Sequence, residues 1–413
     1  MKQLIYRAKR YYHFAKTGIP GLIAAAREGH PERQLKIIMI TGTDGKTTTS
    51  SLIYHLLHHA GYKVGLLSTV AAYIGDKTLD TGFHTTTPSP TDLYRYLHQM
   101  VDAGMEYCVL EMTSQGAYQW RGIGIHATVS GLTNVDHDHW DYHLNFDNYL
   151  QAKTLVLNAA DTAVVADDTE YFHQIKRLLK PTVNLVTYSK TTRFSAPLEK
   201  AIRDRFSEDY NRANAYLAIT ICKHLGVNEK TLQTNIATFK LPEGRLEIIP
   251  TKLNFTMIVD FAHTPQALAA VLPAIHKQYL TGKNQLIGIV GCAGLRDHTK
   301  RPQMGKLMAQ YCDVAIFTSE DPRTENIWSI IQQMKSEISP HQAKVVSIPN
   351  REKALRFALE HYAHDGNVIA IFGKGHEKSM NYDGHTETLW CDRDGARNII
   401  AELESHVHDT DNN

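Results

Sequence analysis

The sequence is poor in cysteine, and the cysteines that it has are not arranged in pairs. There are five of them, an odd number, spread from Cys108 to Cys391 with no C-x-x-C spacing. Such spacing supports neither a disulfide framework nor a thiolate zinc site. We therefore expect a reduced, cytoplasmic protein.

Long apolar runs and an excess of charge are also missing. No apolar stretch reaches the roughly 18 residues of a membrane span, and the N-terminus lacks the apolar core of a signal peptide. The net charge of +1 gives no reason to expect a nucleic-acid partner. With 413 residues, 43% of them hydrophobic, the chain is long enough for two or three globular domains. We expect a monomer.

Acidic residues are absent from the first 16 positions. This segment combines basic with aromatic side chains: Lys2, Arg7, Lys9, Arg10 and Lys16 with Tyr6, Tyr11, Tyr12 and Phe14. One interpretation is a helix that packs against the first domain and keeps its charges in water. The other is a helix that lies on an anionic membrane surface. We favour the first, because single basic, aromatic helices are common.

Apolar, strand-like segments alternate with helical segments in two series, which predicts parallel sheets covered by helices on both faces. The first series comprises 36–41, 64–69, 106–113, 127–135 and 162–167. The second comprises 255–261, 285–291, 314–319, 344–349 and 367–373. Pro242 and Gly244 fall between the two series, where a hinge is expected. We therefore expect an N-terminal basic helical segment (1–35), a first domain (36–242) and a second domain (243–413).

A phosphate-binding loop is indicated by "MITGTDGKTTTS" at 39–50, although the first glycine of the usual G-x-x-x-x-G-K-[ST] motif is missing. Gly45, Lys46 and Thr47 supply the end of the motif, but Ile40 stands where that glycine belongs. The loop follows a strand and opens a helix, so its backbone N–H groups and the positive helix end would face a phosphate. The alternative is a structural turn before a helix.

Later segments decide between a phosphate-binding loop and a structural turn, because they resemble a known family. The loop, "EMTSQGAYQWRG", "TNVDHDHWDYH" and "YLQAK" resemble, in this order, motifs of the Mur ligase family, whose phosphate loop is compact. "LPEGRLE", "VDFAHTPQAL", "GCAGLRDHTKRPQMG", "TSEDPRTEN" and "FGKGHEKSM" follow, so the resemblance covers 36–395. It implies an α/β protein with a P-loop parallel-sheet ATPase domain followed by a Rossmann-like doubly wound domain. It also implies an ATP-dependent amide ligase of peptidoglycan precursor synthesis, which adds a diamino acid to the D-Glu γ-carboxylate of a muramoyl dipeptide.

The resemblance implies catalytic roles for Lys46, Glu111, His139 and Lys153. ATP would phosphorylate the donor carboxylate to an acyl phosphate that the amine then attacks, and phosphoryl transfer needs charge neutralisation and alignment. Lys46 would neutralise the outer phosphates, and Thr47 and Glu111 would hold Mg²⁺. His139 and a carbamate formed from CO2 on Lys153 would hold or orient a second Mg²⁺, because carbamylation turns a cation into an anion that suits a hard metal. The alternative for Lys153 is a solvated helix lysine.

The histidines around His139 also allow a different interpretation. His137, His139 and His143 alternate with Asp136, Asp138 and Asp141, a pattern that also fits a zinc site. We favour Mg²⁺, because ATP-ligase motifs flank this stretch on both sides and carboxylates suit that ion.

The resemblance further assigns residues to three ligands. The ATP contacts are Gly42, Thr43, Asp44, Gly45, Lys46, Thr47, Thr48, Asn211, Asn214, Arg245 and Asp260. The donor-peptide contacts are Thr86, Thr87, Ser114, Gln119 and Arg121. The acceptor contacts are Arg296, Glu320, Asp321, Arg323, Gly373 and Glu377.

Arg323 bears on the identity of the acceptor. Relatives that select meso-diaminopimelate have D-N-P-R, whose arginine pairs with the distal carboxylate, whereas this sequence has E-D-P-R at 320–323. Arg323 keeps the fork that binds a carboxylate, and Glu377 would accept the distal ammonium. Asp321 replaces an amide with an anion, and lysine or another amine becomes acceptable if that charge neutralises Arg323. We favour meso-diaminopimelate; a surface salt bridge is the alternative role of Arg323.

Three departures from the family pattern concern the donor and its holder. The domain that grips the donor's UDP is not recognisable in the 35 residues before the first strand, sheet elements are hard to recognise in the short stretch 168–206, and Gln115 replaces a histidine. Either a UDP-binding partner or the N-terminal segment would hold the nucleotide end, or the donor would be lipid-linked or a free peptide. Two other functions stay open. One is a folylpolyglutamate-synthetase-like glutamate ligase, against which EDPR and GKGHE argue, and the other is a non-catalytic nucleotide-binding module of a cell-wall complex.

Overall fold

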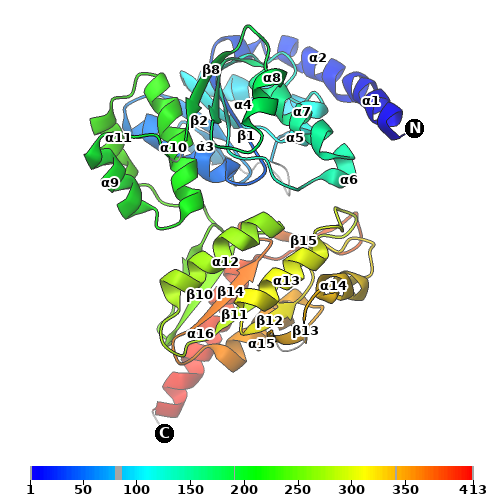
Figure 1. Ribbon diagram of the computed structural model, residues 1–413, viewed down its shortest axis with the longest axis vertical. Helices are drawn as coiled ribbons and strands as arrows, with labels where there is room; N and C mark the ends of the chain where they lie inside the picture. The colour runs from blue at the N-terminus through cyan, green and yellow to red at the C-terminus, as the bar shows by residue number, and fades with distance from the viewer. Residues whose placement is uncertain (1, 80–85, 190, 340–341, 412–413) are drawn as a thin grey trace. The chain divides into compact units, whose positions relative to one another are not determined.

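The computed structural model describes residues 2–79, 86–189, 191–339 and 342–411 (Figure 1). The chain divides into two compact units, Met1–Pro242 and Glu243–Asn413. Each unit is built around its own parallel sheet, so each is described by itself.

The sheet of unit 1 contains eight strands in the order β4-β3-β2-β5-β1-β6-β7-β8. Strand β1 (Lys36–Thr41) lies near its centre, between β5 (Tyr107–Glu111) and β6 (Ala127–Leu132), and both pairings are parallel. The other strands are β2 (Val64–Leu67), β3 (Ala72–Ile74), β4 (Lys77–Leu79), β7 (Ala160–Ala166) and β8 (Asn184–Tyr188). Only β3 and β4 run antiparallel to their neighbours.

Helices cover both faces of this sheet because successive strand side chains point to opposite faces. Ile38 and Ile40 of β1 join the core beneath α3, α9, α10 and α11, whereas Ile37 and Met39 join the core beneath α2 and α4. The helices are α2 (Ile19–Arg27), α3 (Lys46–His59), α4 (Pro90–Asp102), α5 (Ser114–Tyr118), α6 (Trp140–His143), α7 (Phe146–Leu157), α8 (Phe172–Leu178), α9 (Ala196–Arg205), α10 (Asp209–His224) and α11 (Glu229–Ile236).

Unit 2 repeats this plan with six strands in the order β13-β12-β11-β14-β10-β9. All pairings are parallel except that of β9 (Glu247–Ile249) with β10 (Phe255–Asp260). The remaining strands are β11 (Leu286–Val290), β12 (Val314–Phe317), β13 (Lys344–Ser347), β14 (Asn367–Phe372) and the hairpin β15 (Ser379–Asn381) with β16 (Glu387–Leu389). One face packs on α12 (Pro265–Tyr279), α13 (Arg301–Tyr311) and α14 (Ile327–Lys335), the other on α15 (Arg351–Tyr362) and α16 (Asp392–Asp411).

The expected α/β class is confirmed, and each expected apolar segment contains a strand. The strands that the sequence did not indicate are short or lie toward sheet edges. Strand β8, for example, has a half-exposed "NLVTY" pattern and falls in the stretch 168–206, where no sheet element was recognised. Edge strands need less apolar sequence, because one side of them meets solvent.

The N-terminal segment forms α1 (Lys2–His13), a π-helical turn (Phe14–Gly18) and α2. Tyr6 is buried against Tyr118, with ring centres 4.5 Å apart, and its hydroxyl lies 2.8 Å from His143 Nδ1. Helix α1 is thus fixed to unit 1 through its aromatic inner side. Among the described residues, no helix has both the length and the apolar composition to cross a membrane.

Candidate active site

The phosphate loop joins the C-terminal end of β1 to α3, and two of its glycines stand where no side chain fits. Gly45 has φ of +80°, and a Cβ there would come within 2.2 Å of Asn214 Oδ1. A Cβ on Gly42 would come within 1.7 Å of Thr133 Oγ1. The loop is therefore closely packed on two sides, by Thr133 directly after β6 and by Asn214 of α10.

Hydrogen bonds from the segment after β6 hold the loop open. Thr43 N donates to Asn134 O at 3.0 Å, Asp44 N donates to Asn134 Oδ1 at 2.9 Å, and Thr133 Oγ1 donates to Asp44 O at 2.6 Å. Lys46 Nζ folds back onto Thr43 O at 2.8 Å and Gly42 O at 3.1 Å. The ammonium is thereby held beside the carbonyl groups of the loop, at the start of α3.

A hydroxyl and a carboxylate converge beside the loop. Thr47, in the first turn of α3, donates from Oγ1 to Glu111 Oε1 at 3.0 Å and to Oε2 at 3.2 Å. Glu111, at the end of β5, is 1% exposed and also accepts from Thr69 N. Parallel pairing of β1 with β5 brings them together, and oxygen ligands of this kind suit Mg²⁺.

Lys153, on α7, is completely buried, and its Nζ has no hydrogen-bond partner among the described residues. Burial and then the charge on Lys46 hold the pKa of Lys153 well below its usual value, although Asp138, Asp44 and Asp136 oppose this. Burial therefore favours the uncharged form of this side chain. A solvated helix lysine, the alternative suggested by the sequence, is ruled out by this burial.

The three histidines of the 136–143 stretch do not converge on one point. His143 is buried between Tyr6 and Ser114, 3.1 Å from Ser114 Oγ, and burial lowers its pKa to about 3. His137 stacks on Trp140, whereas His139 Nε2 lies 3.3 Å from Asp138 Oδ2. Within the described ranges, no group of three His, Cys, Asp or Glu side chains is placed to hold a metal. Tertiary packing thus directs these side chains to different partners.

The donor-peptide residues expected from the sequence take part in hydrogen bonds within unit 1, in three groups. Thr69 Oγ1 donates to Thr86 Oγ1 at 3.1 Å, and Thr87 O accepts from Arg121. Arg121 Nε also donates to Gln119 Oε1 at 3.0 Å. Gln119 Nε2 donates to the hydroxyl of Tyr142 at 2.9 Å, and Ser114 contacts His143 in a separate pair. Gln115, the position that departs from the family pattern, has a buried Nε2 with no partner among the described residues.

The remaining ATP residues are divided between the units. Asn211 and Asn214 are buried on α10 of unit 1, where Asn211 Nδ2 donates to Glu208 Oε2 at 3.0 Å. In unit 2, Asp260 accepts from Leu246 N and Ala262 N, each at 2.8 Å, while the guanidinium of Arg245 lies 4.1 Å from the centre of the Phe261 ring.

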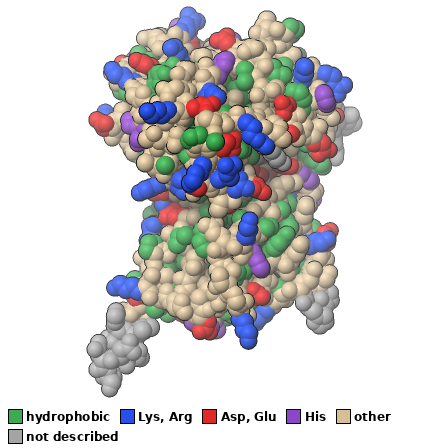
Figure 2. Space-filling model, turned by 60° about the vertical axis from the view of Figure 1, so that its left-hand side comes forward, with side chains coloured by type: hydrophobic (Ala, Val, Ile, Leu, Met, Phe, Trp, Pro, Cys, Tyr) green, Lys and Arg blue, Asp and Glu red, His purple; other side chains and the backbone are tan. Residues whose placement is uncertain are grey.

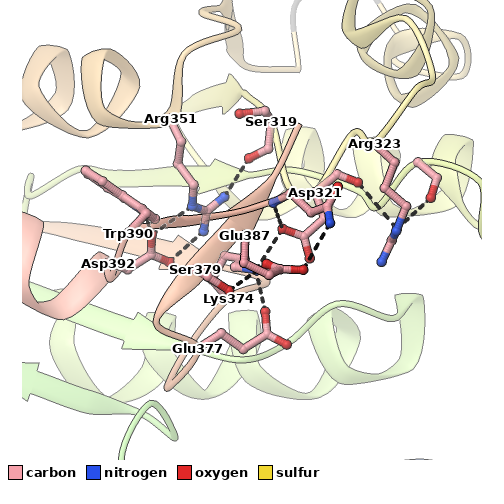
Figure 3. A network of polar contacts seen from close by, with 12 residues as sticks. Ser319, Asp321, Arg323, Arg351, Lys374, Glu377, Ser379, Glu387, Trp390 and Asp392 are labelled. Atoms are coloured by element: carbon pink, nitrogen blue, oxygen red, sulfur yellow. Dashed lines mark hydrogen bonds and ion pairs between the residues drawn. The ribbon is translucent and has the colours of Figure 1, made fainter. Parts of the chain in front are cut away.

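Two of the residues expected to bind the acceptor, Asp321 and Glu377, contact a buried lysine of unit 2 (Figure 3). Lys374 Nζ lies 2.9 Å from Asp321 Oδ1 and 2.6 Å from Glu377 Oε2. Asp321 Oδ1 also accepts from Asn381 N at 3.0 Å. Arg323 Nη1 donates to Gly294 O at 2.6 Å, so a main-chain carbonyl orients its guanidinium. The carboxylate of Asp321 is thus engaged by Lys374.

Glu320 is fully surrounded by protein beside Gly373. A Cβ on Gly373, whose φ is +107°, would come within 2.3 Å of Glu320 Oε2. Burial raises the pKa of Glu320 to about 7, although Lys300, Arg351 and Lys374 lower it. Arg296, in contrast, is exposed in the loop after β11.

Comparison with known proteins decides the family. Residues 40–237 match the Mur ligase middle domain and 244–375 match the Mur ligase glutamate ligase domain. A diaminopimelate-adding UDP-N-acetylmuramoyl-L-alanyl-D-glutamate ligase of Clostridium botulinum is 35% identical over 370 residues, which are 84% of this chain and 74% of that protein. This chain belongs to the Mur ligase family. It is therefore an ATP-dependent, amide-forming ligase, and the resemblance drawn from the motifs is confirmed.

Solved structures agree with this assignment. A UDP-N-acetylmuramoyl-L-alanyl-D-glutamate–2,6-diaminopimelate ligase matches with a TM-score of 0.55 and 26% identity, over 90% of this chain and 79% of that one. A folylpolyglutamate synthase of Mycobacterium tuberculosis has a TM-score of 0.67 over 86% of this chain and 92% of its own. Its identity is 15%, so it shares the fold alone. The expected order of an ATPase domain and a Rossmann-like domain is confirmed.

Two buried cations of this Mur ligase escaped sequence reasoning. Lys374 lies inside the "FGKGHEKSM" motif, which offered a signal, but only its flanking residues were selected. Arg351 is buried and donates to both carboxylate oxygens of Asp392, at 2.8 and 2.6 Å, and to Ser319 O and Phe372 O. It thereby ties the ends of β12 and β14 together. Its position at the start of a helix gave no such signal.

A pocket on the outer side of α10 is separate from these residues. Figure 2 turns α9, α10 and α11 toward the viewer, and basic side chains gather there with acidic ones between them. The pocket has a volume of about 590 Å³ and is lined by Arg193, Phe194, Ala196, Glu199, Arg203, Arg212 and Tyr216. Glu199 already pairs with Arg203 and accepts from Tyr216, so one of the three arginines that line the pocket has a carboxylate partner within the lining.

Proposed function

We propose that this Mur ligase joins the amino group of meso-diaminopimelate to the D-Glu γ-carboxylate of a muramoyl dipeptide in peptidoglycan precursor synthesis. The convergence of Lys46, Thr47 and Glu111 at the ends of β1 and β5 carries the proposal. ATP supplies the phosphoryl group that activates the carboxylate. Lys46 neutralises the phosphate charge, and Thr47 and Glu111 hold the Mg²⁺ that members of the family generally use.

Lys153 is proposed to act as a carbamate. Its neutral amine attacks the carbon of CO2, a C–N bond forms, and one proton leaves to solvent. The product is an anion beside Lys46, and this attraction replaces the repulsion that an ammonium would suffer. A buried amine without a hydrogen-bond partner supports this modification, because an unpaired polar group inside a protein is costly. With His139, the carbamate would hold or orient a second Mg²⁺.

The choice of acceptor is proposed to rest on Arg323. Asp321 is engaged by Lys374 and Asn381 N, which supports a cationic Arg323 available to a distal carboxylate. Two parallel charge-assisted hydrogen bonds would form with meso-diaminopimelate. Lysine lacks that carboxylate. Glu377, Gly373, Glu320 and Arg296 are proposed to complete the acceptor site.

The five donor-peptide residues are proposed to bind the peptide part of the donor, and hydrogen bonds within unit 1 that orient each of their side chains or main chains support this. The carrier of that peptide, a UDP, a lipid or none, is left to the donor panel below. Asn211, Asn214, Arg245 and Asp260 are proposed to contact the nucleoside of ATP.

The test is a panel of acceptors and donors scored by ADP release and product mass. We expect meso-diaminopimelate to exceed L-lysine in kcat/KM, and Arg323→Ala to reduce that ratio by at least about 30-fold, equivalent to about 2 kcal/mol. Arg356→Ala, a change of a partly exposed arginine on α15 that pairs with Glu402, is the matched control and should leave the ratio intact. A wild-type preference for lysine would overturn the acceptor assignment. Glutamate addition to a folate donor, or absence of ADP release with every pair, would overturn the whole proposal.

A further inference from the structure

The outward side of the N-terminal helices is the most apolar exposed surface among the described residues. Large hydrophobic side chains are exposed at 15 described positions, and eight of these fall between residues 4 and 23. The eight are Leu4, Ile5, Tyr11, Tyr12, Phe14, Ile19, Leu22 and Ile23. Single exposed apolar residues are ordinary, but a concentration of them in one short segment indicates an interaction surface.

Helical geometry places the exposed apolar residues of α1 opposite the side of the helix that is fixed to unit 1. At about 100° per residue, Leu4, Ile5, Ala8, Tyr11 and Tyr12 fall within about 120° of the circumference of α1. The buried Tyr6 lies on the other side, with Arg10 and His13 next to it. Helix α1 therefore has two apolar faces, and only one of them is covered by the protein.

Contacts on the inner face prevent α1 from turning its outer face inward. Tyr6 stacks on Tyr118 and bonds to His143, and Trp120 Nε1 donates to Arg10 O at 3.2 Å. The Arg10 guanidinium also lies over the Trp120 ring, 4.2 Å from its centre. Rotation of the helix would break all of these contacts.

The charge around the outer face has one sign. No acidic residue occurs before Glu28, whereas Arg7 and Lys9 flank the apolar stripe on its two edges and Lys16 and Arg27 follow. All four of these basic side chains are exposed. An apolar, aromatic stripe with cations along both edges matches the boundary between acyl chains and anionic headgroups.

We propose that the outer face of α1 and α2 docks on an anionic lipid surface, with the apolar stripe at the level of the acyl chains and the basic edges among the headgroups. A partner protein would be expected to need a shaped, charge-mixed surface, whereas this face is a linear stripe with cations alone. This inference does not depend on the proposed acceptor or donor. If the proposed donor residues are correct, docking brings them close to lipid, because Tyr118 and His143 contact the inner face of the same helix.

The first test measures sedimentation of the full chain with vesicles. We expect binding to phosphatidylcholine vesicles that contain phosphatidylglycerol, little binding to pure phosphatidylcholine, and weakening of the binding as salt is raised. Equal binding to both vesicles, or binding to neither, overturns the proposal. Acceptor turnover is not read in this test, so failure of the proposed function is distinguishable from failure here.

Variants of the outer face supply the second test. Leu4→Gln with Tyr11→Gln should lower the vesicle partition coefficient at least about 10-fold, and Lys9→Gln with Lys16→Gln about 30-fold. The matched controls are Leu389→Gln and Lys230→Gln with Lys353→Gln, which alter equally exposed residue types elsewhere and should bind like the wild type. Melting temperature and ATP turnover should not change in any of these variants. Unaltered partition in the outer-face variants contradicts the proposal, as does a self-association that these variants abolish in the absence of vesicle binding.

Discussion

Each unit of this Mur ligase buries one lysine completely, but only one of the two has charged partners. Lys153 of unit 1 lies on a helix with no hydrogen-bond partner for its Nζ, and its pKa is held well below the usual value. Lys374 of unit 2 lies after β14 between Asp321 and Glu377. Burial lowers the pKa of Lys374, but the two carboxylates outweigh it, so the pKa is raised.

This difference in pairing indicates a structural role for Lys374 and a chemical role for Lys153. A buried ammonium with two carboxylates is stable as a cation and fixes the loops that carry them. A buried amine that lacks a hydrogen-bond partner and has a lowered pKa is costly to keep, and we expect it to react, for example by carbamylation. Five experiments test this contrast between the two lysines.

Loss of the paired lysine should have the largest effect. Lys374→Met removes the buried cation that lies between the carboxylates of Asp321 and Glu377, which should lower the free energy of unfolding by about 3–5 kcal/mol. Urea denaturation of the wild type and the variant measures this. Lys353→Met, an exposed lysine of the same unit, is the control and should change little. Equal stability of Lys374→Met and wild type would show that the pair is not structural.

The neighbour of Lys374 should give unit 2 a pH dependence. The pKa of Glu320 is raised from 4.5 to about 7, so the folded state holds a proton that the unfolded state releases between these values. The free energy of unfolding should therefore fall as pH rises from about 4.5 to 7, by on the order of 3 kcal/mol from this group.

The variant Glu320→Gln should remove this part of the slope and be relatively more stable above pH 7. The exposed Glu337→Gln serves as the control and should keep the wild-type slope. Stability should be compared with the wild type at each pH, since other groups also titrate. A slope that persists unchanged in Glu320→Gln would refute the burial argument.

Replacement of Lys153, which has no hydrogen-bond partner among the described residues, should lower activity without lowering stability. Lys153→Ala should lower kcat at least about 10²-fold, the scale of losing one charge-stabilising group, with partial rescue by small carboxylates such as acetate. Lys153→Met should keep or raise the unfolding midpoint, because a buried amine is replaced by an apolar chain of similar length.

Carbamylation has a readout of its own. Protein incubated with ¹³C-bicarbonate should show a carbamate carbon signal in NMR that Lys153→Ala lacks. The exposed Lys176→Ala should retain the signal and the activity. A wild type without the signal, together with an active Lys153→Ala, would make Lys153 an unreactive core residue.

The smallest effect on stability is expected for the hydrogen bond between Tyr6 and His143, because both side chains are neutral. Tyr6→Phe removes the hydroxyl that lies 2.8 Å from His143 Nδ1, and should cost about 1 kcal/mol of unfolding free energy. Thermal unfolding measures it. Tyr11→Phe alters an exposed tyrosine of the same helix and is the control. If Tyr6→Phe lowers the free energy of unfolding as much as Lys374→Met does, then the packing of helix α1 is essential for the stability of unit 1.

Much of the fold could be predicted from local sequence. Apolar runs such as 36–41 and 367–373 are too long and too uniform for surface loops, and both form central strands. The phosphate loop could be predicted as well, because Gly45, Lys46 and Thr47 must be contiguous to act together. Edge strands such as β8 could not, because their mixed pattern also suits a loop.

The candidate site divides in the same way between sequence and structure. By itself, the sequence determined the family, the phosphate loop and the order of the motifs, because these depend on contiguous residues. Only the tertiary structure decided that Lys153 Nζ lies over the Tyr149 ring with no hydrogen-bond partner among the described residues, while Lys374 pairs with two carboxylates. One of these belongs to Asp321, 53 positions away from Lys374. It also decided that Asp321 is engaged by a lysine, and that His143 bonds to Tyr6, 137 positions earlier. Charge state and pairing depend on what surrounds a side chain in space, and local sequence carries no record of it.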